Sequence, residues 1–343
     1  MTRHILSKFF YMTLLLSAPY LVFAEQLSFS KIEAGENYQF NYQWLDHQGD
    51  TQTINFLLPK QAMFDRFRNF KIYKPGMAKF SINNALQKKL RADPIRGVMI
   101  DFKKNANNEI TIKGRNDKAI NNAYFKINEL KKMLHNKYLT ENYYHQFVNH
   151  DQINAIKPDH ARFANIASKD LKQVKPIILE KFSIKNIRKI TSYILGFVQS
   201  IPYSTLESRV TASGAGFNPP LKLLWENQGD CDSKVTLTAA IFRTLMPRIK
   251  MILVFIDNHA LIGIEAPVHA DDQTINIDGI SYVLAEPTGP GLFKLGEIAQ
   301  ESELAVGNGH YTAELFHAKD RVPIKTEIKP ELEKQDSAET DEQ

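Results

Sequence analysis

The chain has 343 residues, of which 43% are hydrophobic, and a formal net charge of +5 at pH 7. This length and apolar content suffice for two modest cores or one large one, and we expect two domains. The first 24 residues carry +2 and residues 326–343 carry −5, so residues 25–325 hold +8. Such a surplus favours anionic partners such as envelope polymers or lipid headgroups, although most lysine-rich stretches are simply solvated faces. No basic stretch alternates with aromatic residues, which argues against a nucleic-acid platform.

The first twenty-four residues have the pattern of an export signal. Arg3 and Lys8 give a positive start, residues 9–23 form an apolar run, and Val22-Phe23-Ala24 satisfies the cleavage rule. The run is shorter than the ~20 apolar residues that a membrane span needs. We therefore predict cleavage, a mature chain that begins near Glu25, and a periplasmic or secreted protein. Membrane association is expected only if this segment stays uncleaved.

Residues 25–155 are predicted to form an amino-terminal domain of mixed α and β structure. Aromatic and β-branched runs at 38–44 and 51–58, joined by a His-Gln-Gly-Asp turn, predict a hairpin. The remaining elements expected here are a helix over 80–90, strands over 98–102 and 109–112 around a turn at 105–108, and a helix over 120–138. No group of residues in this part indicates chemistry, so we interpret it as a packing or docking domain.

Residues 156–325 are predicted to form the second domain. Polar residues and Pro158 mark the boundary that precedes it. Ser183 can cap a helix whose apolar residues recur every three or four positions from Ile184 to Val198. Residues 211–220 are rich in glycine and proline and are expected to form a mobile loop. Residues 231–246 then predict a helix with one buried face.

Cys231 is the only cysteine, and it lies in the first turn of that last helix. An exported chain normally pairs its cysteines, so a single one is either a buried small hydrophobe or a working thiol. Asp230 can cap the helix, and the N–H groups of its first turn stabilise a thiolate. The charges of Asp230 and Asp232 oppose this, so a base must take the thiol proton, and we expect a histidine.

His259 and Glu286 are the candidates that accompany the thiol. Four strands are predicted, over 249–256, 259–265, 273–277 and 280–285, and they form two consecutive hairpins. The hairpins bring the His259 and Glu286 ends of adjacent strands to one edge of a sheet, where the carboxylate can orient the imidazole. Asp278, in a turn at the opposite edge, is the weaker candidate.

The order of a cysteine on a helix, a histidine on a strand and an acid at a strand end resembles the transglutaminase-like superfamily. Gly-Asp-Cys at 229–231 and Glu-Pro-Thr at 286–288 contribute to this resemblance, which covers about residues 164–298. Residues 197–203 are similar to the helix that precedes the active-site segment of the family. The resemblance implies an α+β fold with a papain-like core, in which the nucleophile helix packs on an antiparallel sheet.

The same resemblance implies that Cys231 is the nucleophile, His259 the base and Glu286 the orienting acid, where the family more often has aspartate. The expected chemistry is acyl transfer, most simply hydrolysis of a peptide or amide bond in a protein or peptide substrate, with an envelope component as one option. Gln228 and Trp225 are candidates for the second donor to the oxyanion. The alternatives are a cross-linking acyltransferase and an inactive relative that binds an envelope protein or peptide.

The other histidines, including His145, His150 and His160, lack the spacing and companions of a metal site, so neither a metal nor a cofactor is expected. Residues 326–343 are acidic and contain few apolar side chains, which predicts disorder.

Overall fold

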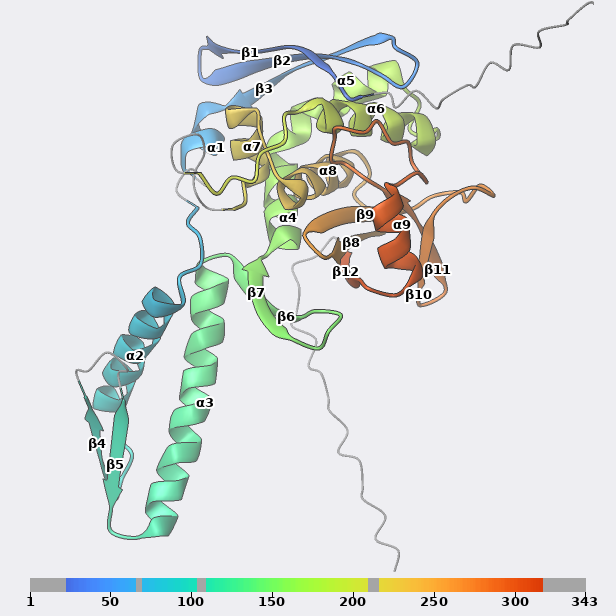
Figure 1. Cartoon of the computed structure of the whole chain (residues 1–343). Helices are drawn as coiled ribbons and strands as arrows, with labels where there is room; N and C mark the ends of the chain where they lie inside the picture. Colours follow the sequence, from blue (N-terminus) through green and yellow to red (C-terminus); the bar gives the residue numbers. More distant parts are fainter. Residues whose placement is uncertain (1–22, 66–69, 104–108, 209–215, 317–343) are drawn as a thin grey trace, which may run out of the picture.

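A five-stranded antiparallel sheet organises the carboxyl-terminal half, in a computed structural model that describes residues 23–65, 70–103, 109–208 and 216–316. Its strand order is β10-β11-β9-β8-β12 (Figure 1). The strands are β8 (Met251–Ile256), β9 (His259–Glu265), β10 (Thr274–Ile277), β11 (Ile280–Ala285) and β12 (Thr312–Phe316). The two predicted hairpins of this region are confirmed by the pairings of β8 with β9 and of β10 with β11.

Helix α8 (Cys231–Leu245) packs against β9 and is enclosed by α4, α6 and α7. We predicted one buried face, but all its residues except Asp232 are buried, because neighbouring elements surround it. Apart from α8, the helices of this half are α4 (His160–Asp170), a 3-10 turn η1 (Leu171–Gln173), α5 (Val174–Lys181), α6 (Ile187–Ser200), α7 (Pro220–Glu226) and α9 (Gln300–Gly307). Helix α6 begins later than predicted, because Asn186 rather than Ser183 caps it, through its side chain and the N–H of Lys189.

A three-stranded amino-terminal sheet covers the outer side of α6. Its strands are β1 (Gln26–Ala34), β2 (Asn37–Leu45) and β3 (Thr51–Pro59), in the order β1-β2-β3. The ring centroids of Tyr42 and Trp44 lie 4.8 and 5.5 Å from that of Phe197, and the Tyr193 hydroxyl donates to the carbonyl of Thr53 at 2.6 Å. The sheet therefore shares one hydrophobic core with α6 and α8.

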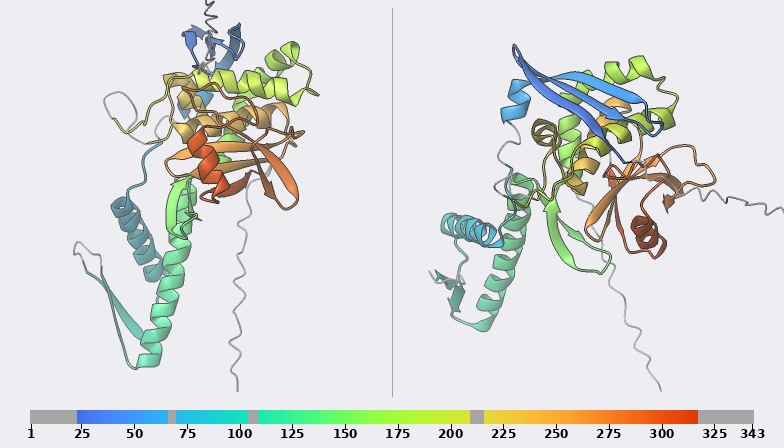
Figure 2. Two further views of the ribbon diagram at one scale, coloured as in Figure 1. Left: turned by 45° about the vertical axis from the view of Figure 1, so that its right-hand side comes forward. Right: turned by 45° about the horizontal axis from the view of Figure 1, so that its top comes forward.

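A long arm projects from this body (Figures 1 and 2). It consists of α2 (Pro75–Ala92), β4 (Val98–Phe102), β5 (Ile110–Gly114) and α3 (Asp117–Glu141). The arm has a hydrophobic cluster of its own, centred on Leu86, Ile112 and Ile127. Short α1 (Lys60–Asp65) precedes it, and the hairpin of β6 (Tyr144–Val148) and β7 (Asn154–Pro158) returns the chain to the body.

Among the described ranges, no helix has both the length and the apolar character needed to cross a membrane. Four predictions fall wholly or largely outside those ranges: the export signal, the turn at 105–108, most of the loop at 211–220 and the disordered tail.

Candidate active site

Cys231 is the first residue of α8 and is 8% exposed. The helix begins there because the side chain of Asp230 accepts a hydrogen bond from the N–H of Ser233 at 3.0 Å. Gly229 lets the chain approach α7: a Cβ at this position would lie 2.7 Å from Cδ1 of Leu223. The thiol is thus held in the first turn of a helix, where backbone N–H groups and the helix dipole favour an anion.

His259 is the first residue of β9, directly after the turn in which Asn258 has a φ of 57°. The contact between α8 and β9 places its ring beside the thiol. The distance from Nδ1 of His259 to Sγ of Cys231 is 2.9 Å. The helix and the strand together therefore bring a candidate base to the thiol, as the sequence predicts.

Glu286 follows β11, which pairs with β9 so that Ala285 lies opposite Ile262. Its Oε1 lies 2.9 Å from Nε2 of His259. Its Oε2 accepts hydrogen bonds from the N–H of Ala299 at 2.8 Å and the hydroxyl of Ser302 at 3.4 Å. These contacts hold both carboxylate oxygens in place. Asp278 lies in the turn between β10 and β11, away from this end of the strands.

The two contacts of His259 determine its charge. Burial lowers its pKa, but the hydrogen bonds and charges of Cys231 and Glu286 outweigh burial and raise the pKa to about 10. At neutral pH the ring is therefore an imidazolium, with Nε2–H donated to Glu286 and Nδ1 facing Sγ of Cys231. A positive charge beside a thiol favours the thiolate, which is the nucleophilic form of cysteine.

Two aspartates flank the thiol. Burial raises the pKa of Asp230 to about 7, and the charge of Asp232 adds to this shift. Partial burial also raises the pKa of Asp232, while the charges of Lys157 and His259 oppose that change. Protonation of Asp230 near neutral pH reduces the negative charge that would otherwise oppose the thiolate.

Cys231, His259 and Glu286 are called the triad below. Three further residues adjoin it and were not predicted as site residues. The amide of Gln199 donates to the carbonyl oxygens of Glu286 and Phe293 at 2.8 and 2.9 Å. It thereby fixes both ends of the segment from Glu286 to Phe293, which follows β11. Lys234 is fully buried on α8, and burial lowers its pKa to about 7 while the charge of Cys231 opposes the shift.

Tyr203 is the third. Burial raises the pKa of the Tyr203 hydroxyl, and the negative charges of Cys231 and Asp230 raise it further. The side chain is about half exposed, and an isolated β-bridge pairs Tyr203 with Gly229, two residues before Cys231. A polar residue in an apolar helix, such as Lys234, is a signal that sequence reading could have used. Tyr203 gives no comparable signal, because only the fold brings it to α8.

Gln228 and Trp225 lie just upstream of the thiol. The indole of Trp225 contacts the amino-terminal sheet: its centroid is 4.8 Å from the ring of Tyr38 and 3.8 Å from Nζ of Lys31. The carbonyl of Gln228 accepts from the side chain of Asn218 at 3.2 Å. The side chain of Trp225 therefore packs on β1 and β2. Gln228 lies three residues before Cys231 and remains a candidate donor to the oxyanion.

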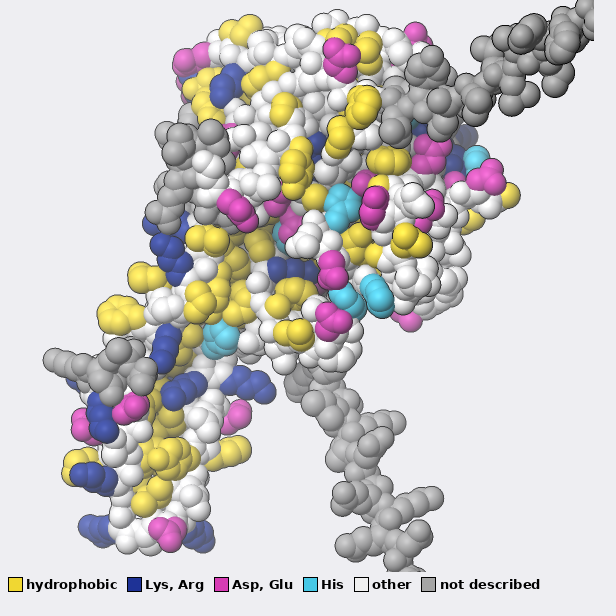
Figure 3. Space-filling view, in the orientation of Figure 1, with side chains coloured by type: hydrophobic (Ala, Val, Ile, Leu, Met, Phe, Trp, Pro, Cys, Tyr) yellow, Lys and Arg dark blue, Asp and Glu magenta, His cyan; other side chains and the backbone are white. Residues whose placement is uncertain are grey.

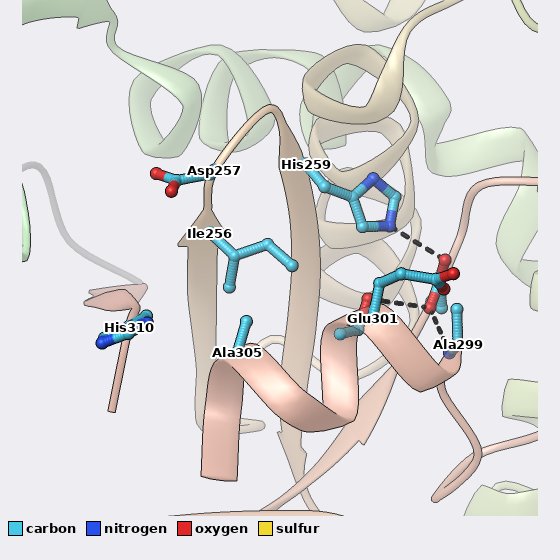
Figure 4. A pocket seen from close by; sticks show the side chains of 9 residues that line it. Ile256, Asp257, His259, Ala299, Glu301, Ala305 and His310 are labelled. Carbon is cyan, nitrogen blue, oxygen red and sulfur yellow. Dashed lines mark hydrogen bonds and ion pairs between the residues drawn. The ribbon is translucent and has the colours of Figure 1, made fainter. Parts of the chain in front are cut away.

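A pocket of about 400 Å³ lies beside the triad. Figure 4 shows it between the end of β8, with Ile256 and Asp257, and helix α9, which contributes Glu301 and Ala305. His259 and Glu286 form the wall that it shares with the triad. In the described part of the chain, no three His, Cys, Asp or Glu side chains are grouped so that they could hold a metal ion.

Comparison of the chain with protein-family models, with curated proteins and with solved structures finds no match.

Proposed function

We propose that this protein is an exported thiol-dependent acyl-transfer enzyme of the transglutaminase-like type that hydrolyses a peptide or amide bond. One observation carries the proposal: the imidazole of His259 lies 2.9 Å from the thiol of Cys231 and 2.9 Å from the carboxylate of Glu286. A nucleophile, a base and a group that orients the base are the parts that acyl transfer needs. The arrangement of a nucleophile helix on an antiparallel sheet supports the assignment of a papain-like core.

The first half of the reaction forms a thioester. The Cys231 thiolate attacks the carbonyl carbon of the substrate, and the electron pair of the C=O bond moves to oxygen. The N–H of Cys231 in the first helical turn is one donor to this oxyanion. Tyr203 and Gln228 are the candidates for the second, because Tyr203 bridges to Gly229 and Gln228 precedes Gly229 in the chain. The imidazolium of His259 then gives its proton to the leaving amine as the carbon–nitrogen bond breaks.

The second half releases the acyl group. His259, now neutral at Nδ1, takes a proton from water, whose oxygen attacks the thioester carbon. Collapse of the intermediate expels the Cys231 thiolate and restores the ion pair. Glu286 holds the Nε2–H tautomer and stabilises the imidazolium throughout, without taking the proton. An amine in place of water gives cross-linking, and the pocket beside His259 has room for either acceptor.

The pH dependence of iodoacetamide alkylation of Cys231 tests the proposal. We expect the rate to be close to its maximum at pH 6 to 7 and to fall about a hundredfold at pH 6 in His259→Ala, because the imidazolium that favours the thiolate is lost. Cys231→Ala is the control for labelling elsewhere. Peptide amides and acyl esters are then screened for acylation of Cys231, followed by mass spectrometry. An unreactive thiol, unchanged by His259→Ala, would contradict the enzyme and favour the inactive peptide-binding relative.

A further inference from the structure

The arm formed by residues 75–141 carries the positive charge of the protein. It contains fourteen lysines and arginines against six aspartates and glutamates, a net charge of +8. Residues 25–325 also sum to +8, so the body within that range is neutral. The charge is therefore concentrated on the projecting part of the molecule, at a distance from the candidate active site (Figures 1 and 2).

Large apolar side chains are exposed on the arm among these cations. Met77 and Phe80 on α2 are 61% and 57% exposed, Met99 on β4 is 66% exposed, and Phe125 on α3 is 67% exposed. Solvent exposure of so many large apolar side chains on one small unit indicates an interaction surface.

The apolar and basic side chains are interleaved. On α3, Phe125 lies seven residues from both Lys118 and Lys132, so the three share the outer face of the helix. On α2, Lys88 and Arg91 continue the outer stripe that begins with Met77 and Phe80. Figure 3 shows apolar side chains running along the visible face of the arm, with Lys and Arg on both sides.

We propose that the arm is a docking surface for an anionic lipid bilayer. Cations attract the negative headgroups, and apolar side chains beside them enter the boundary between headgroups and acyl chains. A soluble polyanion satisfies the charges but leaves Met77, Phe80 and Phe125 in water, which is why lipid is the better match. Helix α3, with 25 residues, is about 37 Å long, so the arm offers an extended face to such a surface.

Co-sedimentation with vesicles tests this. The protein is a chain that begins at Glu25, which keeps every described helix and strand and removes the apolar residues 9–23. We expect it to bind vesicles of equal parts phosphatidylglycerol and phosphatidylcholine at 50 mM salt and not to bind vesicles of pure phosphatidylcholine. At 500 mM salt the bound protein should be released, because salt screens the attraction between the cations and the headgroups.

Two pairs of variants locate the surface. Charge reversal at the exposed Lys88, Arg91, Lys118 and Lys132 (each →Glu) should weaken binding at least tenfold. The same change in net charge at four exposed lysines of the body (Lys169, Lys172, Lys185 and Lys189, each →Glu) should leave binding within about twofold. Phe80→Ser with Phe125→Ser should weaken binding at constant charge, whereas Ile184→Ser with Val268→Ser, at exposed apolar residues of the body, should not.

Circular dichroism spectra that match those of the unaltered chain establish that each variant is folded. Failure to bind the anionic vesicles, equal losses in the arm and body variants, or tighter binding to a DNA duplex than to the vesicles would each overturn the proposal. None of these outcomes depends on the reactivity of Cys231, so the arm and the proposed enzyme are tested separately.

Discussion

The buried ammonium of Lys234 donates a hydrogen bond to the carbonyl oxygen of Ile201 at 2.5 Å and a longer one to that of Gln199 at 3.4 Å. Lys234 lies one turn after Cys231 on α8, and Ile201 ends the helix α6 that Gln199 belongs to. The relationship joins the nucleophile helix to the segment that carries Gln199 and Tyr203. It also places a buried amine, whose pKa burial lowers to about 7, on the same helix as the thiol and in a region otherwise filled by apolar side chains.

We predict that Lys234→Met changes the stability of the protein by an amount that depends on pH. Loss of the donor leaves buried carbonyl groups unpaired, which costs about 1–3 kcal/mol. The folded-state pKa of about 7 lies below the unfolded value of about 10.4, so the unfolded chain binds more protons between these values. The charged lysine therefore costs most stability below pH 7, and this cost disappears as the pH rises towards 10.

Urea unfolding of both proteins at pH 6, 8 and 9.5 measures this difference. The unaltered protein should gain stability relative to Lys234→Met across the series. A difference between the two proteins that stays constant with pH would show that Lys234 does not titrate in this range.

We predict that Glu286→Gln lowers the rate of acyl transfer by about 10³- to 10⁴-fold, the order seen when a triad acid loses its charge. The amide keeps the size of the side chain but removes the charge that helps to raise the pKa of His259. The alkylation rate of Cys231 should then fall at pH 6 and recover at higher pH. Asp278→Asn, in the turn at the far end of β11, is the matched control and should leave both rates unchanged.

We predict that Asp230→Asn becomes more stable than the unaltered protein as the pH rises. The folded-state pKa of about 7 lies above the unfolded value of about 3.9, so the folded state holds the proton more tightly and loses stability between pH 4 and 7. Asparagine keeps an oxygen that caps the helix and does not titrate. Urea unfolding at pH 4, 6 and 8 checks this; parallel pH profiles for the two proteins would contradict it.

We predict that Gly229→Ala destabilises the protein by about 1–3 kcal/mol, the usual cost of overpacking. The new Cβ would lie 2.7 Å from Leu223 Cδ1 and 3.2 Å from Cβ of Ser233, so α7 and the start of α8 must separate. The alkylation rate of Cys231 should change as well, because its helix begins two residues later. Gly76→Ala on α2, where a Cβ meets nothing within 4 Å, is the control and should cost no stability.

The sequence predicted the local elements of the candidate site well. The apolar and β-branched runs over 249–256 and 280–285, with their short turns, predicted the hairpins that carry His259 and Glu286. The cap at Asp230 predicted the start of α8, because the pattern depends on residues three or four positions apart. The cap predicted at Ser183 was wrong: Asn186 caps α6, and local sequence does not separate them because both side chains can accept a hydrogen bond.

The sequence by itself therefore determined the local features of the site. These are the helix that begins at Cys231, the strands that follow it in the chain, and the order of thiol, imidazole and carboxylate. Tertiary structure alone decided that Tyr203, Gln199 and Lys234 adjoin the triad, that β1 to β3 share the core of α6, and that the positive charge lies on a separate arm. The physical reason is range: caps, turns and periodicity act over a few residues. Burial, packing and the fields that shift pKa values depend on side chains that are distant in the chain and adjacent only after folding.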